Sequence, residues 1–357
     1  METDYPIPLD ENGGRRSARG LHSNTFSAEI IQRRRSTSLS DDYSVQKTND
    51  DAAESKYVAV KMGYYNDEFL PYVLSLPSDH VNRRDPEISR GYWARVTAIR
   101  TLVDKFIRAA GPTCQLINIG AGYDTLYWRL KKDSLQFGKY VDVDFSSVTA
   151  KKIRQIHKNK SHLASFFSET PKEAQHADFL AGDYCLIGAD VRQKQELKSK
   201  FETAAVDFKA PTLFICECVL VYMHAYQSAE FVKTLATWFD TAVFINYEQV
   251  NLKDSFGEVM QRNLQQRGIV LEGLSFCESL DTEKNRFLEN GWNKVAVWDM
   301  WEIYDKILPK EERLRIERIE LLDEKELLSQ LLEHYCITVA YKHHSEDCIS
   351  FGEFLFS

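Results

Sequence analysis

A glycine turn and a downstream carboxylate are the residues whose spacing most clearly indicates chemistry. An apolar run over 115–119 ends at Gly120-Ala-Gly122, and an apolar helical pattern begins at Leu126. A strand, a glycine turn and a helix in this order are typical of a nucleotide-binding pocket at the carboxyl end of a first strand. A dinucleotide fingerprint would have a third glycine where this chain has Thr125, so we expect an adenosine ligand without a pyrophosphate and disfavour an NAD oxidoreductase.

Asp144 is the second half of this signal. It lies at the end of the strand-like segment 139–145, 24 residues after Gly120. A carboxylate about 20 residues beyond a glycine turn can accept hydrogen bonds from both hydroxyls of a ribose. The alternative interpretation is a plain turn and a helix cap. Either signal alone would be weak, but the pair favours a binding site.

Other charged residues lie where apolar or aromatic side chains surround them. Glu217 interrupts the very apolar segment 211–223, and a charge inside a parallel sheet is costly unless it meets a ligand or a partner. Arg90 and Arg95 flank a glycine and two aromatics just before an amphipathic helix. We expect this stretch to frame a ligand, with simple surface solvation of the arginines as the alternative.

Composition limits the classes of function. The 357 residues carry a formal net charge of −8, which gives no general attraction to nucleic acid. The sequence contains neither an apolar run of about 18 residues nor an apolar amino-terminal stretch, so we expect no membrane span and no signal peptide. Its seven scattered cysteines indicate reduced core residues in a cytoplasmic protein, with the nucleus as a second compartment. Cys216-Glu-Cys218 has no second ligand pair, so we expect no metal site.

The chain divides into a tail, a cap and a core. We expect a disordered tail over 1–50, a helical cap over 51–110, a core over 111–345 and a C-terminal extension over 346–357. Within the core, strand patterns alternate with helical ones, which predicts an α/β fold with a mostly parallel seven-stranded sheet and helices on both faces. The polar segment 251–290 is predicted to be an insertion at the substrate mouth. The strand patterns cover 115–119, 139–145, 184–190, 211–223, 242–248, 294–300 and 336–342.

Five segments together resemble the leucine carboxyl methyltransferase family, which is a family of class I S-adenosylmethionine enzymes with a Rossmann-like fold. The resemblance extends from about residue 55 to 343. It implies that the chain methylates the carboxy-terminal leucine of the catalytic subunit of type 2A protein phosphatase. The segments are Asn-Ile-Gly-Ala-Gly-Tyr-Asp-Thr (118–125), Val-Asp-Val-Asp-Phe (141–145), Ile-Gly-Ala-Asp-Val-Arg (187–192), Cys-Glu-Cys-Val-Leu-Val-Tyr-Met (216–223) and Arg-Gly-Tyr-Trp-Ala-Arg (90–95).

The resemblance also implies which residues bind S-adenosylmethionine. Arg95 would pair with the methionine carboxylate, Asp144 would hold the ribose, and Glu217 would lie near the sulfonium. The remaining cofactor contacts implied by the family fall on Lys56, Gly120 and the Asp190–Val191 pair, which would flank the adenine.

The chemistry of the substrate suggests a site without a general base. A terminal carboxylate, with a pKa of about 3.3–3.7, is already ionised at pH 7. We therefore expect neutral donors near it, and Tyr222 is the candidate catalytic residue that would orient the substrate carboxylate. Asn246 and Tyr247 are weaker candidates, and packing in the core is the alternative for all three.

Three other functions share some of these features. An O-methyltransferase of a small-molecule carboxylate would use every cofactor residue, and a non-catalytic phosphatase-binding protein would have lost them. A transfer RNA-modifying paralogue carries kelch repeats, which this sequence lacks. We expect a monomer that contacts the phosphatase tail and its folded surface through 55–93 and 251–290.

Overall fold

The computed structural model describes residues 23–74, 83–174, 178–343 and 350–356, with side chains from Asp42 onward. The chain forms two compact units, Met1–Tyr43 and Ser44–Ser357. The described part of the first unit belongs to helix α1 (Ser23–Lys61), which continues into the second. The expectation of a disordered segment 1–50 is therefore wrong for 23–50. We expected disorder because apolar residues do not recur at helical spacing in this segment. That absence indicates only that a helix has no apolar packing face, and Ala28 to Arg35 are mostly good helix formers.

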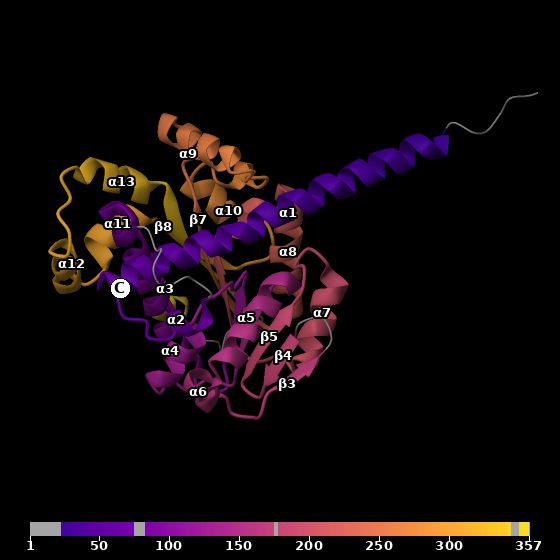
Figure 1. Ribbon diagram of the computed structural model, residues 1–357, viewed down its shortest axis with the longest axis horizontal. Coiled ribbons are helices and arrows are strands. Elements are labelled where there is room, and N and C mark those ends of the chain that lie inside the picture. Colours follow the sequence, from indigo (N-terminus) through magenta and orange to yellow (C-terminus); the bar gives the residue numbers. More distant parts are fainter. Residues whose placement is uncertain (1–22, 75–82, 175–177, 344–349, 357) are drawn as a thin grey trace, which may run out of the picture. The chain divides into compact units, whose positions relative to one another are not determined.

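The second unit is built on one mixed sheet, and the expected α/β class I fold is confirmed (Figure 1). Five strands are parallel in the order β5-β2-β1-β6-β7, and β9 and β8 follow antiparallel to their neighbours. All seven occupy the predicted segments. Their bounds are β1 Gln115–Ile119, β2 Lys139–Asp144, β5 Tyr184–Gly188, β6 Thr212–Glu217, β7 Thr241–Gln249, β8 Lys294–Asp299 and β9 Tyr335–His343.

Two further strands extend the sheet, so the described part of the chain has nine strands where seven were expected. The strands β3 (Lys172–Ala174) and β4 (Asp178–Ala181) are antiparallel, and β4 pairs with β5. Both arise in the polar stretch before β5. At three and four residues they are too short for an alternating pattern to reveal them in the sequence.

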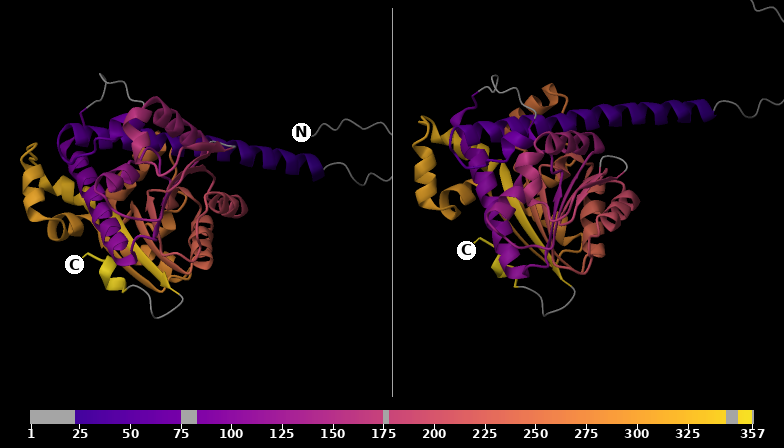
Figure 2. Two further views of the ribbon diagram at one scale, coloured as in Figure 1. Left: turned by 90° about the horizontal axis from the view of Figure 1, so that it is seen from below. Right: turned by 60° about the horizontal axis from the view of Figure 1, so that its bottom comes forward.

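Helices cover both faces of the sheet, as Figure 2 shows for the second unit. One apolar core lies under α3, α4 and α5 and includes Trp93 and Trp128, whereas the other lies under α7, α8 and α10 and includes Phe201 and Phe287. The helices of these layers are α3 Pro86–Ala110, α4 Leu126–Lys132, α5 Ser146–Lys158, α7 Lys194–Thr203, α8 Ala225–Trp238 and α10 Leu280–Leu288.

The insertion expected over 251–290 is shorter than predicted. Its first part forms α9 (Ser255–Gln266), but α10 is the crossover helix of the core, because the Phe287 ring lies 5.1 Å from that of Phe244 in β7. The C-terminal segment packs on the core as well, with Phe354 buried 5.9 Å from Phe106. Shorter elements are α2 Leu70–Val73, α6 Lys160–Leu163, α11 Met300–Glu302, α12 Lys310–Glu317, α13 Lys325–Glu333, η1 Ala164–Phe166, η2 Leu220–Tyr222, η3 Leu274–Phe276, η4 Ile303–Ile307 and η5 Phe351–Phe354.

In the described residues, no helix has the length and apolar character that crossing a membrane requires.

Candidate active site

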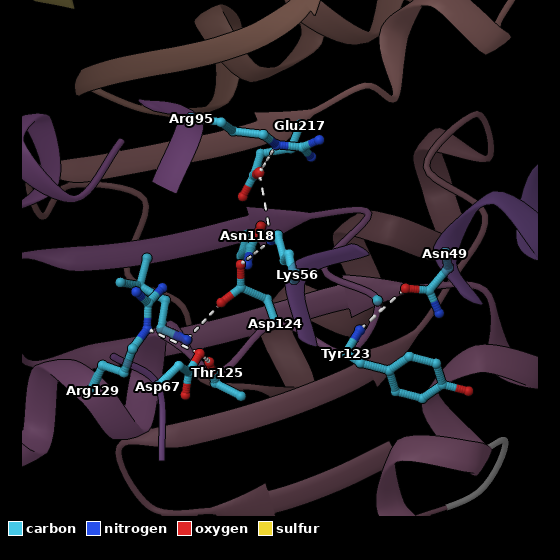
Figure 3. Close-up of polar contacts among 12 residues, drawn as sticks. Asn49, Lys56, Asp67, Arg95, Asn118, Tyr123, Asp124, Thr125, Arg129 and Glu217 are labelled. Atoms are coloured by element: carbon cyan, nitrogen blue, oxygen red, sulfur yellow. Dashed lines mark hydrogen bonds and ion pairs between the residues drawn. The ribbon is translucent and has the colours of Figure 1, made fainter. Parts of the chain in front are cut away.

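The glycine turn lies between β1 and α4, as predicted. Gly120 and Gly122 have φ angles of +65° and +50°, the left-handed region in which a side chain is strained. A Cβ at Gly120 would also overlap the side chain of Val219, and one at Gly122 would overlap the amide of Asn49. Asn49 accepts a hydrogen bond from the Tyr123 N–H at 3.3 Å, so α1 contacts this turn (Figure 3). These close approaches require glycine at both positions.

Asp144 ends β2 directly beside the glycine turn. Its two carboxylate oxygens accept from the backbone N–H groups of Gly122 and Phe145, each at 2.7 Å. Burial raises the pKa of Asp144 to about 6, although both hydrogen bonds favour the ionised form. Each oxygen keeps a second lone pair, so the carboxylate can also accept from ribose hydroxyls.

Asp190 and Val191 follow β5, the strand next to β2. The Ala189 N–H donates to the Asp144 carbonyl at 2.9 Å, which places this segment beside the ribose candidate. The Asp190 carboxylate is itself bound by Arg192, whose Nε lies 2.9 Å from Oδ1. The structure therefore brings three of the predicted cofactor residues to adjacent strand ends.

Two cations and two carboxylates meet on the other side of the glycine turn. We call Lys56, Arg95, Asp124 and Glu217 the mouth cluster. Lys56 Nζ lies 3.4 Å from Asp124 and 3.7 Å from Glu217, and Arg95 Nε donates to Glu217 at 2.5 Å (Figure 3). Three of these residues were predicted from the sequence, and they come from α1, α3 and β6.

Asp124 is the member of the mouth cluster that the sequence analysis missed. The signal was present, since Asp124 directly follows Gly-Ala-Gly-Tyr in the same turn. Burial favours its neutral form, but Lys56, Arg129 and Lys152 together lower the pKa of Asp124 far below its usual value. It is therefore an ionised carboxylate at neutral pH.

A second layer of side chains holds Asp124 and the turn in place. Lys152 is fully buried, and its ammonium donates to the Asp124 carbonyl at 2.7 Å and to Asp142 at 2.8 Å. Thr125 donates to Asp67 at 2.5 Å (Figure 3). The threonine that replaces the third glycine of a dinucleotide fingerprint thus anchors the turn.

Tyrosines line the mouth cluster beyond Arg95. The guanidinium carbon of Arg95 lies 4.4 Å from the ring centroid of Tyr247 and 5.6 Å from that of Tyr92. Tyr335 stacks on Tyr247 with the centroids 5.3 Å apart. Tyr247 was a weaker candidate from the sequence. Tyr335 was not predicted, because it starts β9 without any motif around it.

Tyr222 and Asn246 are placed differently from the prediction. The strand β6 stops at Glu217, so Tyr222 lies in η2 and not at the strand end. Burial raises the pKa of Tyr222 above its ordinary value. Asn246 is fully buried beside Glu248. Alternate residues of a strand face opposite sides, so Asn246 points away from Tyr247 and does not line the mouth.

One group in the described residues has the composition of a metal site. Glu248, Cys277 and Glu283 lie close together and are buried. However, Arg286 Nη1 donates to Glu248 and lies 3.4 Å from Glu283, so a guanidinium already occupies the position between the carboxylates. Cys216 and Cys218 are free thiols.

The sheet order and the site define a class I methyltransferase, with the candidate ligand-binding residues at the carboxyl ends of the parallel strands around the glycine turn. The leucine carboxyl methyltransferase family matches residues 28–236. The chain is 47% identical over 316 residues to probable leucine carboxyl methyltransferase 1 of Caenorhabditis briggsae, covering 88% of this chain and 96% of that protein. The rat leucine carboxyl methyltransferase 1 is 42% identical, with coverages of 86% and 92%. The chain belongs to the leucine carboxyl methyltransferase family.

A relative with another name shares the same region. The human tRNA wybutosine-synthesizing protein 4 is 35% identical over 303 residues, which cover 83% of this chain but only 44% of that protein. Among solved structures, the chain is similar to magnesium protoporphyrin IX methyltransferase from Synechocystis with bound S-adenosylhomocysteine (TM-score 0.40, 10% identity, covering 74% and 90%).

Proposed function

We propose that the protein transfers the methyl group of S-adenosylmethionine to the α-carboxylate of the C-terminal leucine of the type 2A protein phosphatase catalytic subunit, forming a methyl ester. The mouth cluster is the observation that carries the cofactor part of this proposal. A methionine moiety is a zwitterion, and the cluster offers two cations for its carboxylate and two carboxylates for its ammonium. The family membership supports the leucine carboxylate as the acceptor.

The residues present fit S-adenosylmethionine at each of its polar groups. Arg95 uses Nε to bind Glu217, which leaves its two terminal nitrogens for the methionine carboxylate. Lys56 is the second cation for this carboxylate, and Asp124 is the ionised partner for the ammonium. Asp144 meets the ribose, and the segment of Asp190 and Val191 flanks the adenine.

The protein's part in catalysis is to orient the acceptor and exclude water. Bound S-adenosylmethionine supplies an electrophilic methyl group, and the acceptor carboxylate is ionised without help from a base. Because a negative and a positive charge are lost together, a dry pocket favours the transition state over the reactants. A direct clamp of the acceptor by Arg95 would stabilise the ground state instead.

Tyr222 is the proposed orienting group for the acceptor carboxylate, and the rings of Tyr247 and Tyr335 exclude water around it. Neutral hydroxyl donors can align an oxygen without cancelling its charge. Burial keeps the pKa of Tyr222 above its ordinary value, so the hydroxyl remains a proton donor throughout the physiological range.

The proposed partner is the folded phosphatase, which would meet the cap and α9 as well as the site. Val259 and Val270, in and just after α9, are 49% and 44% exposed. A short tail buries little area, so contacts of this kind would add to selectivity. We place the reaction in the cytoplasm, with the nucleus as a second compartment.

The test is transfer of labelled methyl from S-adenosylmethionine to the intact catalytic subunit and to the subunit without its terminal leucine. Base-labile label on the intact subunit alone is expected, with Arg95→Ala as the cofactor control. Label on the truncated subunit, or none on either while S-adenosylhomocysteine still binds, would reject the protein substrate. In that case small-molecule carboxylates and transfer RNA are the next acceptors to assay.

A further inference from the structure

The turn of residues 218–222 connects β6 to the helix α8 and carries Tyr222. Cys218 within it has a φ of +57°, a conformation that residues with a Cβ rarely adopt. Its N–H donates to the carbonyl of Tyr247 at 2.7 Å. Strained turns of this kind persist only where neighbouring groups hold them in place.

Glu248 binds the backbone of the second half of this turn. Its Oε1 accepts from the N–H of Val221 at 2.6 Å, and both residues are fully buried. The other oxygen accepts from Arg286 Nη1. We call Glu248, Glu283 and Arg286 the buried cluster. The hydrogen bond from the Val221 N–H joins this cluster to the turn, one residue before Tyr222.

The composition of the buried cluster argues against a purely structural role. Two carboxyls share one guanidinium, and all three side chains have no exposed surface. Burying such groups is costly, and apolar residues of similar volume often give equal or greater stability. Burial raises the pKa of Glu283 well above its usual value.

We propose that Glu248 is a positioning residue for methyl transfer, which holds the 218–222 turn through the Val221 N–H so that the Tyr222 hydroxyl meets the acceptor carboxylate. Arg286 binds the other oxygen of the Glu248 carboxylate. The catalytic consequence rests on the proposed function, whereas the structural link from Glu248 to the turn does not.

Two matched double variants separate the acceptor atom from the ion pair. Glu248→Gln with Arg286→Met removes both charges but keeps an oxygen that accepts from Val221. Glu248→Leu with Arg286→Met removes the same charges and the acceptor. We expect the glutamine variant to keep the wild-type kcat within about twofold and the leucine variant to lose roughly tenfold or more, the usual effect of an unmade buried hydrogen bond.

The KM for S-adenosylmethionine should change less than about twofold in both variants, because the mouth cluster is untouched; a merely structural defect would move the two parameters together. Glu248→Asp is the second variant if the leucine variant does not fold. It keeps a charge for Arg286 but draws the acceptor back from Val221, so the same selective loss of kcat is expected.

Hydrogen exchange at the Val221 amide, measured with S-adenosylhomocysteine present, tests the link without any methyl acceptor. Exchange should be fast in the leucine and aspartate variants and slow in the glutamine variant and the wild type. The proposal would be overturned if the glutamine and leucine double variants had the same Val221 exchange rate and the same kcat. It would also be overturned if both variants lost kcat equally. If the wild type methylates no phosphatase but the exchange pattern holds, the proposed function fails and the positioning of the turn stands.

Discussion

The mouth cluster and the buried cluster are built from the same residue types but differ in access and in charge balance. The mouth cluster has two cations for two carboxylates, with side chains 8–15% exposed. The buried cluster has one cation for two carboxyls and no exposed surface. The accessible side chains of the mouth cluster can exchange their ion pairs with each other for ion pairs with a zwitterionic ligand. The buried cluster is closed to a ligand, so its side chains can only hold the surrounding backbone in place.

An isolated charged residue in an apolar segment therefore indicates that the charge has a role, but it does not show whether this role is ligand binding or the positioning of the backbone. Glu217 is the last residue of β6 and Glu248 the last but one of β7, and both bind an arginine. The carboxylate of Glu217 faces the glycine turn, and that of Glu248 faces the interior. Mutations in the two clusters should therefore separate loss of ligand binding from loss of folding.

Arg286→Ala should have the largest effect on stability. It would leave the Glu248 carboxylate buried without a counter-ion, so the free energy of unfolding should fall by about 3–5 kcal/mol. Urea titration followed by circular dichroism measures this change. Arg100→Ala, which removes partly exposed pairs with Asp104 and Asp133, is the matched control and should cost about 1 kcal/mol or less. A loss for Arg286→Ala as small as that of the control would contradict the distinction between the clusters.

Arg95→Ala should affect ligand binding more than folding. Removing a charged hydrogen-bond donor costs about 1.5–3 kcal/mol, which corresponds to a loss of S-adenosylhomocysteine affinity of roughly ten- to hundredfold. Isothermal titration calorimetry gives this loss directly, with Arg100→Ala again as the control. Unchanged affinity would show that the methionine carboxylate is bound elsewhere.

Asp124→Asn should give a loss of about tenfold in the same assay. The amide oxygen can still accept from the Leu126 N–H, which now binds Asp124 at 2.6 Å, so the turn should keep its conformation. The specific measurement is a thermodynamic cycle, in which the affinities of the wild type and the variant are compared for S-adenosylhomocysteine and for an analogue that lacks the α-amino group. The variant should bind both ligands equally. A persistent preference for the parent ligand would place its ammonium away from Asp124.

Seven strands of the sheet and most residues of the candidate site could be predicted from the sequence. Parallel strands have continuous apolar runs, and Gly120, Asp144 and Glu217 stand out against them because their chemistry conflicts with burial. The positions of seven strands could be predicted for the same reason.

The missed features depend on distant partners or on very short elements. Tyr335 and the buried cluster are functional candidates only because β9 and α10 pack against β7. No local sequence pattern predicts this packing. Likewise, the amide of Asn49 becomes part of the site through the path of α1. The hairpin of β3 and β4 is too short to show a period.

Lowering the pH should produce the smallest effect. We expect this effect to act through Asp144, a proposed cofactor-binding carboxylate whose pKa is raised. Because the pKa of Asp144 is raised to about 6, its carboxylate gains a proton as the pH falls from 7.5 to 5.5. A protonated carboxyl accepts less well from ribose hydroxyls, so S-adenosylhomocysteine affinity should fall about fourfold over this range. Asp124 stays ionised throughout, since its pKa is lowered.

Asp144→Asn is the control, with weaker binding that should no longer depend on pH in this range. Unfolding through Asp144 cannot mimic the effect. Its pKa in the folded protein lies above its ordinary value, so the folded protein binds the proton more tightly, and this group's contribution to stability increases as the pH falls toward 4. A wild-type affinity that is flat between pH 7.5 and 5.5 would therefore mean that the ribose does not meet the ionised Asp144, and that charge recognition lies entirely in the mouth cluster.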